Sequence, residues 1–133
     1  MSRLTFVNLP VKDVAKAREF FTAIGFEFND QFADENTNCM VISEQAYVML
    51  HAEPTFEMYA EGAVADPATA REVLLGVSAD SRADVDDLIA KIAAAGGTTG
   101  DLVDQGPMYM QPFHDIDGHR WSVTYMDMSA FAE

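Results

Sequence analysis

The sequence predicts an α+β fold built from two βαβββ modules. Two segments with helical periodicity are each preceded by one β-rich segment and followed by three. This order of elements is an internal repeat even without similarity between the two copies. At 133 residues, the chain has room for one domain with a substantial core. We therefore expect a single domain, with module one at residues 1–53, a linker or lid at 54–70 and module two at 71–133.

Module one begins with a predicted strand over residues 4–11, followed by a helix in the segment DVAKAREFFTAIG. Asp13 can cap the start of this helix, and Gly25 can take the left-handed conformation at its end. Apolar residues recur at helical spacing on one face: Val14, Ala17, Phe21 and Ile24. Three predicted strands follow, separated by polar turns: FEFNDQF, TNCMVIS and AYVMLHAE.

Module two repeats this order. A predicted strand, EVLLGVSA, precedes the helical segment DSRADVDDLIAKIAAAGG, in which Ser81 and Asp84 resemble a capping box. One stripe of that helix is apolar: Val85, Leu88, Ile89 and Ile92. The last three predicted strands are TTGDLV, PMYMQPF and RWSVTYM. Between the modules, the linker PTFEMYAEGAVADPAT is rich enough in apolar residues for a lid, a binding loop or a segment packed on the domain surface.

Each module has one helix to cover one face of its strands, so the opposite faces should line a cavity. Period-two alternation assigns the side chains to these faces. The predicted helix-facing residues are Val48, Leu50, Trp121, Val123 and Tyr125. The residues predicted to face away from the helices are Tyr47, Met49, His51, Arg120, Ser122 and Thr124.

The composition limits the classes of partner. Eight basic and twenty-two acidic residues give a formal charge of −14, which disfavours nucleic acid and anionic membranes. The same charge favours cationic small molecules, although an acidic coat that keeps the protein soluble is the more ordinary explanation. The lone Cys39 lies in an apolar run and suits a reducing compartment. No apolar run approaches the ~20 residues of a membrane span, so we expect a cytoplasmic protein.

Two segments resemble the vicinal oxygen chelate superfamily, which includes glyoxalase I, the bleomycin-resistance proteins and extradiol dioxygenases. FVNLPVKDVAKAREFFTAIGFEF is similar to its first module, and FHDIDGHRWSV to its final hairpin, which usually reads Asp-Pro-Asp-Gly. The resemblance covers almost the whole chain. It implies the glyoxalase/bleomycin-resistance fold, with the two modules forming a curved mixed sheet around a cavity, and it implies a homodimer.

The metal ligands of that superfamily do not transfer to this chain. Their four aligned positions are Phe6, Met49, Leu74 and Ser122, and none of these side chains is a useful ligand for a divalent ion. The remaining histidines at the DIDG turn, His114 and His119, fit a hairpin with polar ends better than a metal site. The sequence therefore predicts no metal and no cofactor.

These residues predict a binding protein that resembles the bleomycin-resistance branch. An apolar centre ringed by polar groups suits an organic ligand, cationic or aromatic, unless the apolar side chains simply fill the cavity. The predicted ligand-binding residues are Phe6, Asn8, Tyr47, Met49, His51, Leu74, Ser122 and Thr124. Ser78 is a further polar candidate.

Two alternatives keep an active site, so the sequence leaves open whether the protein is an enzyme. In the first, a lyase, isomerase or hydrolase uses His51 as general base and Tyr47 as proton donor or oxyanion partner. In the second, His51 and Glu53 contribute to an atypical metal site.

Overall fold

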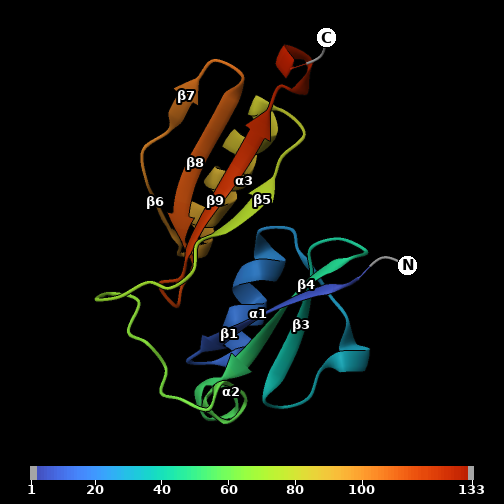
Figure 1. Ribbon diagram of the computed structural model, residues 1–133, viewed down its shortest axis with the longest axis vertical. Helices are drawn as coiled ribbons and strands as arrows, with labels where there is room; N and C mark the ends of the chain where they lie inside the picture. Colours follow the sequence, from blue (N-terminus) through green and yellow to red (C-terminus); the bar gives the residue numbers. More distant parts are fainter. Residues whose placement is uncertain (1–2, 132–133) are drawn as a thin grey trace. The chain divides into compact units, whose positions relative to one another are not determined.

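The computed structural model describes residues 3–131. The chain divides into two compact units, of which the first ends at Asp66 and the second begins at Pro67. Each unit has its own mixed sheet beside α-helices, as Figure 1 shows. The strand order is β1-β4-β3-β2 in the first sheet and β5-β9-β8-β6 in the second, where β7 also pairs with β8. This architecture confirms the predicted α+β class. In both sheets the first strand pairs in parallel with the last, while the remaining pairs are antiparallel.

The first unit holds seven elements among the described residues. They are β1 (Thr5–Val11), α1 (Val14–Ala23), β2 (Glu27–Phe28), the 3-10 helix η1 (Asp30–Phe32), β3 (Thr37–Val41), β4 (Ala46–Ala52) and α2 (Glu53–Ala60). Asp13 caps α1, because its carboxylate accepts a hydrogen bond from the Lys16 amide at 3.0 Å. Gly25 takes a φ of 108° after the helix, as predicted.

The core of the first unit lies between its sheet and α1. Val48 and Leu50 are buried on this face, as the alternation of β4 predicted. Phe20, which lies outside the predicted stripe of α1, also joins the core and meets Phe21 edge to face. The other buried apolar residues of the helix and its neighbouring strands are Leu9, Val11, Ala17, Ile24, Cys39 and Met40.

The prediction of a strand over residues 26–32 is wrong beyond Phe28. There the chain turns into η1, because the Asn29 side chain accepts a hydrogen bond from the Gln31 amide at 2.9 Å. Such a local side-chain bond competes with the strand ladder. Arg18 of α1 then holds the turn through an ion pair with Asp30 at 2.6 Å.

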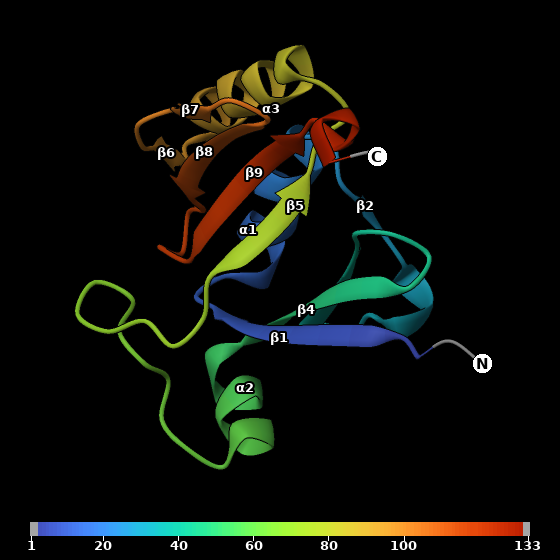
Figure 2. The ribbon, with the colours of Figure 1, turned by 45° about the horizontal axis from the view of Figure 1, so that its top comes forward.

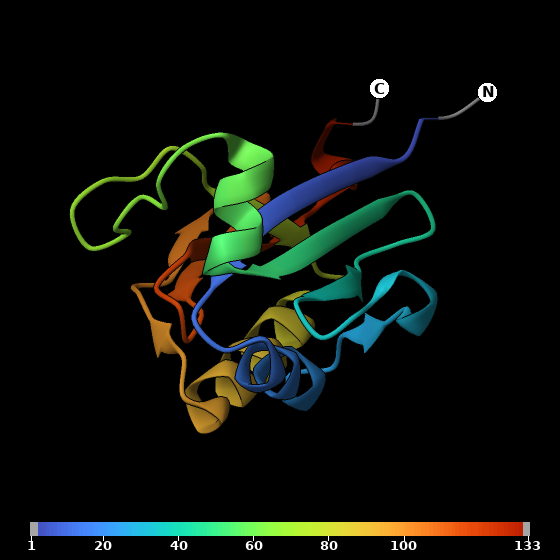
Figure 3. The same ribbon diagram turned by 90° about the horizontal axis from the view of Figure 1, so that it is seen from below.

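The segment predicted as a linker or lid begins with a helix. α2 follows β4 directly and lies beside β1, as Figure 3 shows. Pro54 stands at the start of α2, where its missing amide hydrogen costs nothing. Glu61 ends the helix in the left-handed conformation. Figure 2 shows α1 and α2 on opposite sides of the β1–β4 pair. The first sheet is therefore covered in part on both faces.

The second unit holds the remaining seven elements of the described chain. They are β5 (Leu75–Ser78), α3 (Arg82–Ala95), β6 (Thr98–Thr99), β7 (Val103–Gln105), β8 (Met108–His114), β9 (Arg120–Met126) and the 3-10 helix η2 (Met128–Phe131). The Ser81 hydroxyl accepts a hydrogen bond from the Asp84 amide, and the Asp84 carboxylate accepts one from the Asp80 amide. The first bond confirms Ser81 as the cap of α3, while the second is made to the residue before the cap.

The core of the second unit lies between its sheet and α3. Val85, Tyr109 and Val123 form its centre, and Leu88, Ile89 and Tyr125 pack against them. Trp121 is also buried and stacks on Phe113 at a centroid distance of 6.0 Å. The alternation predicted for residues 120–126 is confirmed in β9.

The predicted strand over residues 98–103 is interrupted. β6 ends at Thr99, and β7 begins only at Val103, because Gly100 lies opposite Pro112 of β8. Pro112 can accept a hydrogen bond from the Gly100 amide but has no N–H to return. A Cβ atom at Gly100 would lie 2.8 Å from Pro112 Cγ. The ladder therefore breaks at this point, and residues 100–102 form a bulge.

Strands β8 and β9 form the predicted hairpin around the DIDG turn. Asp115 is buried at 5% exposure, and one carboxylate oxygen accepts from the Asp117 and His119 amides. Its other oxygen accepts from the indole N–H of Trp121 at 3.0 Å. The polar residues of the turn therefore organise the hairpin. No helix within residues 3–131 is long and apolar enough to cross a membrane.

Candidate ligand-binding site

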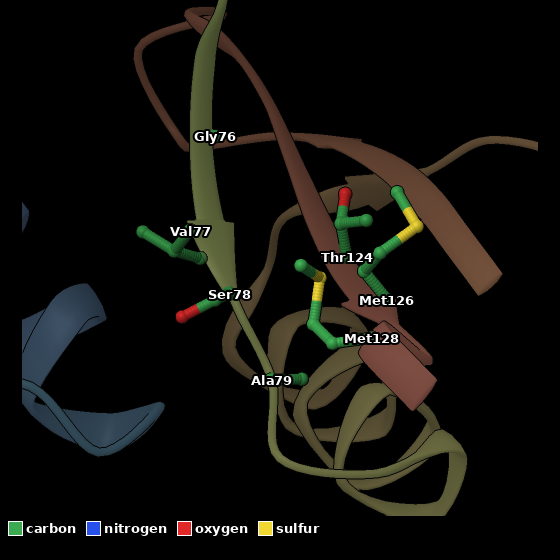
Figure 4. Close-up of a pocket in the computed structure, with 7 residues that line it drawn as sticks. All are labelled: Gly76, Val77, Ser78, Ala79, Thr124, Met126 and Met128. Carbon is green, nitrogen blue, oxygen red and sulfur yellow. The ribbon is translucent and has the colours of Figure 1, made fainter. Parts of the chain in front are cut away.

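The second unit contains a pocket of about 470 Å³ on the strands β5 and β9. Figure 4 shows its lining residues, which are Gly76, Val77, Ser78, Ala79, Thr124, Met126 and Met128. The size lies in the range of small-molecule sites. The lining side chains carry hydroxyl, thioether and aliphatic groups, and no charged residue is among them. Such a lining suits an organic ligand with an apolar body and few hydrogen-bonding groups.

The parallel pairing of β5 with β9 brings these residues together. In the ladder, Ser78 pairs with Thr124 and Gly76 pairs with Ser122. Paired residues point to the same face of a sheet, so the hydroxyl groups of both strands gather on one face. A Cβ atom at Gly76 would meet the Ser122 hydroxyl at 3.4 Å. Thr124 and Ser78, two of the predicted polar groups, thus line the pocket, while Ser122 lies beside it.

Sequence reasoning missed several lining residues. Met126 continues the alternation of Ser122 and Thr124, so extending that pattern by one step would have found it. Met128 follows the strand in η2 and is 68% exposed. No periodic signal marks Met128, because the chain leaves the strand before reaching it. Leu74, a predicted ligand-binding residue, lies just before β5 with 69% of its side chain exposed and does not line the pocket.

The first unit carries another group of predicted ligand-binding residues. Phe6 of β1 stacks on Tyr47 of β4, with ring centroids 5.4 Å apart and planes at 18°. Phe6 remains 51% exposed, so one aromatic surface is open for contact with a ligand. The Tyr47 hydroxyl donates to the Glu44 carbonyl at 3.0 Å. Met49 lies between Tyr47 and His51 on the same face of β4.

His51 is buried at 4% exposure within a hydrogen-bond network. Its Nε2 lies 2.8 Å from the Asn8 side-chain oxygen, and its Nδ1 lies 2.8 Å from the Thr37 hydroxyl. The Tyr59 ring of α2 lies 5.4 Å from the imidazole. In the tautomer that satisfies every partner, Nε2 donates to Asn8 and Nδ1 accepts from Thr37. Both ring nitrogens are therefore bonded within the protein.

Burial also keeps His51 neutral. Desolvation lowers its pKa below the ordinary 6.5, and the negative charge of Asp34 opposes this shift only in part. The structure therefore brings Asn8 and His51 together, but it does not place the Tyr47 hydroxyl with them. This arrangement gives the imidazole a structural role.

The lowered pKa of His51 predicts a pH dependence of stability. The unfolded chain binds a proton at a higher pH than the folded one, so the unfolding free energy falls as pH drops below 6.5 towards the folded pKa. The slope that one such group can contribute has an upper limit of about 1.4 kcal/mol per pH unit. Urea unfolding followed by circular dichroism between about pH 7.5 and 5 measures it.

His114 contributes with the same sign, because burial, Arg71 and Arg120 lower its pKa. The variants His51→Gln and His114→Gln separate the two contributions. Each substitution should reduce the pH dependence of the unfolding free energy by the contribution of the replaced histidine. The contribution of the other histidine should remain. If the unfolding free energies of wild type and His51→Gln differ by the same amount at every pH, the assignment to His51 is wrong.

The residues at the superfamily's metal positions do not fit a metal. Phe6 is engaged in an aromatic stack, Leu74 extends into solvent, and neither Met49 nor Ser122 is an anionic ligand. Within residues 3–131, no group of three or more His, Cys, Asp and Glu side chains could hold a metal ion. His51 and Glu53 therefore have no third such ligand among the described residues.

Comparisons with known proteins agree with this fold. The family model described as "Bleomycin resistance protein-like N-terminal" matches residues 3–43. No curated protein sequence matches the chain significantly. Among solved structures, the hypothetical protein SA1046 from S. aureus has a TM-score of 0.81 at 24% identity, over 94% of this chain and 95% of that one.

Two further solved structures carry family descriptions. A glyoxalase/bleomycin resistance protein/dioxygenase family enzyme from Burkholderia phytofirmans has a TM-score of 0.78 at 16% identity, covering 92% of this chain and 98% of that one. A glyoxalase-related enzyme from Fulvimarina pelagi also has a TM-score of 0.78, at 15% identity, covering 93% of this chain and 88% of that one. The chain therefore has the glyoxalase/bleomycin-resistance fold, and together with the match over residues 3–43 this confirms its resemblance to the vicinal oxygen chelate superfamily.

Proposed function

We propose that this protein binds a small organic molecule without a metal ion, and that the ligand carries an aromatic and cationic group. The observation that carries the proposal is the pocket of about 470 Å³ in the second unit, with Thr124 and Met126 on its wall. Ser78, Thr124 and Met126 line it from the face of the sheet opposite α3, where alternation places the side chains that do not enter the core. Val77 and Ala79, which also line it, pack against the core on the helix side.

Charge and aromatic surface support the nature of the ligand. The net charge of −14 raises the local concentration of cations around the protein. The exposed Phe6–Tyr47 stack in the first unit provides a further surface for a planar ring. The residues at the metal positions supply no anionic ligand, which supports binding that does not depend on a metal.

Calorimetric titration tests the proposal with metal-free bleomycin and with the planar cation acridinium. We expect binding that is weakened at least tenfold, by roughly 1.4 kcal/mol or more, in Ser78→Trp, because the indole would fill the pocket. Ser78 is exposed, so the fold should tolerate this change. Ala90→Trp, on the exposed side of α3, is the matched control and should bind as wild type does. No heat with either probe at high concentration would reject the proposal.

The enzymatic alternative has weaker support. His51 remains the candidate general base, but a substrate could reach its ring nitrogens only by displacing Asn8 or Thr37. An unchanged turnover of carbonyl substrates by His51→Ala would remove that role. We further propose that the protein acts as a homodimer in the cytoplasm. Sedimentation at micromolar concentration tests the first point, and cell fractionation tests the second.

A further inference from the structure

Methionine is concentrated on the pocket face of the second sheet. Met126 and Met128 line the pocket, and Figure 4 shows both side chains beside Thr124. Across the ladder, Met108 pairs with Met126 and Met110 pairs with Thr124. Directly paired residues share a face, so two more thioethers adjoin the lining. Half of the eight methionines of the chain therefore lie on this face or at its end.

We infer that this pocket is an adaptable site for planar aromatic cations, in which the thioethers of Met126 and Met128 contact the ligand ring. This inference rests on the proposed function and specifies how the pocket would select its ligands. Methionine is unbranched and polarisable, so it can repack around rings of different outline and makes favourable sulfur–aromatic contacts. Leucine or valine in place of these methionines would repack less readily around rings of different outline.

The charges around the pocket favour a cation. Residues 72–81 and 121–131 contain no lysine or arginine, although Arg82 and Arg120 adjoin these ranges. The Arg82 guanidinium donates to the Gly106 carbonyl and lies 3.8 Å from the Asp104 carboxylate. Asp127 stands between the two lining methionines, and Asp80 follows the last lining residue of β5. Asp127 is fixed at the end of β9, because its amide donates to the Pro107 carbonyl at 2.8 Å and its carboxylate accepts from the Ser129 amide at 3.1 Å. An aromatic cation would therefore find apolar contact beside negative charge.

The double variant Met126→Leu/Met128→Leu tests the role of the thioethers. Leucine keeps the size and apolar character of methionine but lacks the sulfur, and such substitutions usually preserve the fold. We expect wild type to bind a bicyclic quinolinium and a tricyclic acridinium with similar dissociation constants. The double variant should bind both probes about threefold to tenfold more weakly. The two dissociation constants should also differ more from each other than they do in wild type. Calorimetric titration measures both effects.

Controls separate this inference from the proposed function. Met58→Leu changes an exposed methionine of α2, in the first unit, and should bind both probes as wild type does. The single variant Met128→Leu, at a side chain that is 68% exposed, should show part of the loss without risk to the fold.

If the double variant binds both probes as tightly as wild type does, the role of the thioethers is overturned, while the pocket remains a binding site. Failure of wild type to bind either probe, or binding that Ser78→Trp does not weaken, would overturn the proposed function and this inference with it.

Discussion

Replacing Asp115 with alanine is expected to lower the free energy of unfolding by about 3 kcal/mol, because buried donors would lose their acceptor. The carboxylate accepts from Trp121 Nε1 and from the amides of Asp117 and His119. Trp121 is the single tryptophan of the chain, so its fluorescence during urea unfolding reports directly on this hairpin.

Asparagine at position 115 provides the graded comparison. Burial raises the pKa of the Asp115 carboxyl, and this effect outweighs the opposing influence of His119 and of the hydrogen-bond donors. The amide oxygen of Asp115→Asn can still accept from the backbone while avoiding a buried charge, so we expect a smaller loss than in Asp115→Ala. Asp101→Asn, at an exposed position of the same unit, should leave stability unchanged. An Asp115→Ala variant with the wild-type urea midpoint would contradict the assignment.

Replacing His51 with alanine is expected to lower the free energy of unfolding by about 2 kcal/mol. The substitution leaves a cavity and removes the hydrogen-bond partner of the buried Thr37 hydroxyl. The Asn8 side chain would lose its bond as well, but it is exposed and can bond to water. Urea unfolding measured by far-ultraviolet circular dichroism tests this expectation.

Tyr47→Phe is the matched change on the same strand. It removes a hydroxyl that donates only to the Glu44 carbonyl in an exposed bond, so its effect on stability should be below about 1 kcal/mol. Binding of acridinium to the second unit should be the same in both variants. A His51→Ala protein that is as stable as wild type but has lost a measurable carbonyl turnover would instead make the imidazole a base.

Local sequence patterns predicted the repeated elements of this fold. The spacing of Val85 and Ile92 gave the buried stripe of α3, and the Ser81–Asp84 pair marked its start. Alternation in β9 separated the buried Trp121 and Val123 from Thr124 on the pocket face. These features were predictable because helical and strand periodicities depend on residues only a few positions apart.

Contacts between distant segments decided the rest. Gly100 and Pro112 break a strand only because the ladder places them opposite each other. The segment of α2 was predicted as part of a linker, because no capping residue marks the start of this helix. The helix is stabilised instead by packing on β1 and β4.

The sequence by itself determined the α+β class, the caps of α1 and α3, most of the core-facing residues of these helices, and the absence of metal ligands at the superfamily's positions. Only the tertiary structure decided that His51 is locked between Asn8 and Thr37, and that Met128 reaches a pocket beside Ser78. The physical reason is that strand pairing joins residues far apart in the chain, and no periodic pattern along the sequence encodes which side chains will then meet.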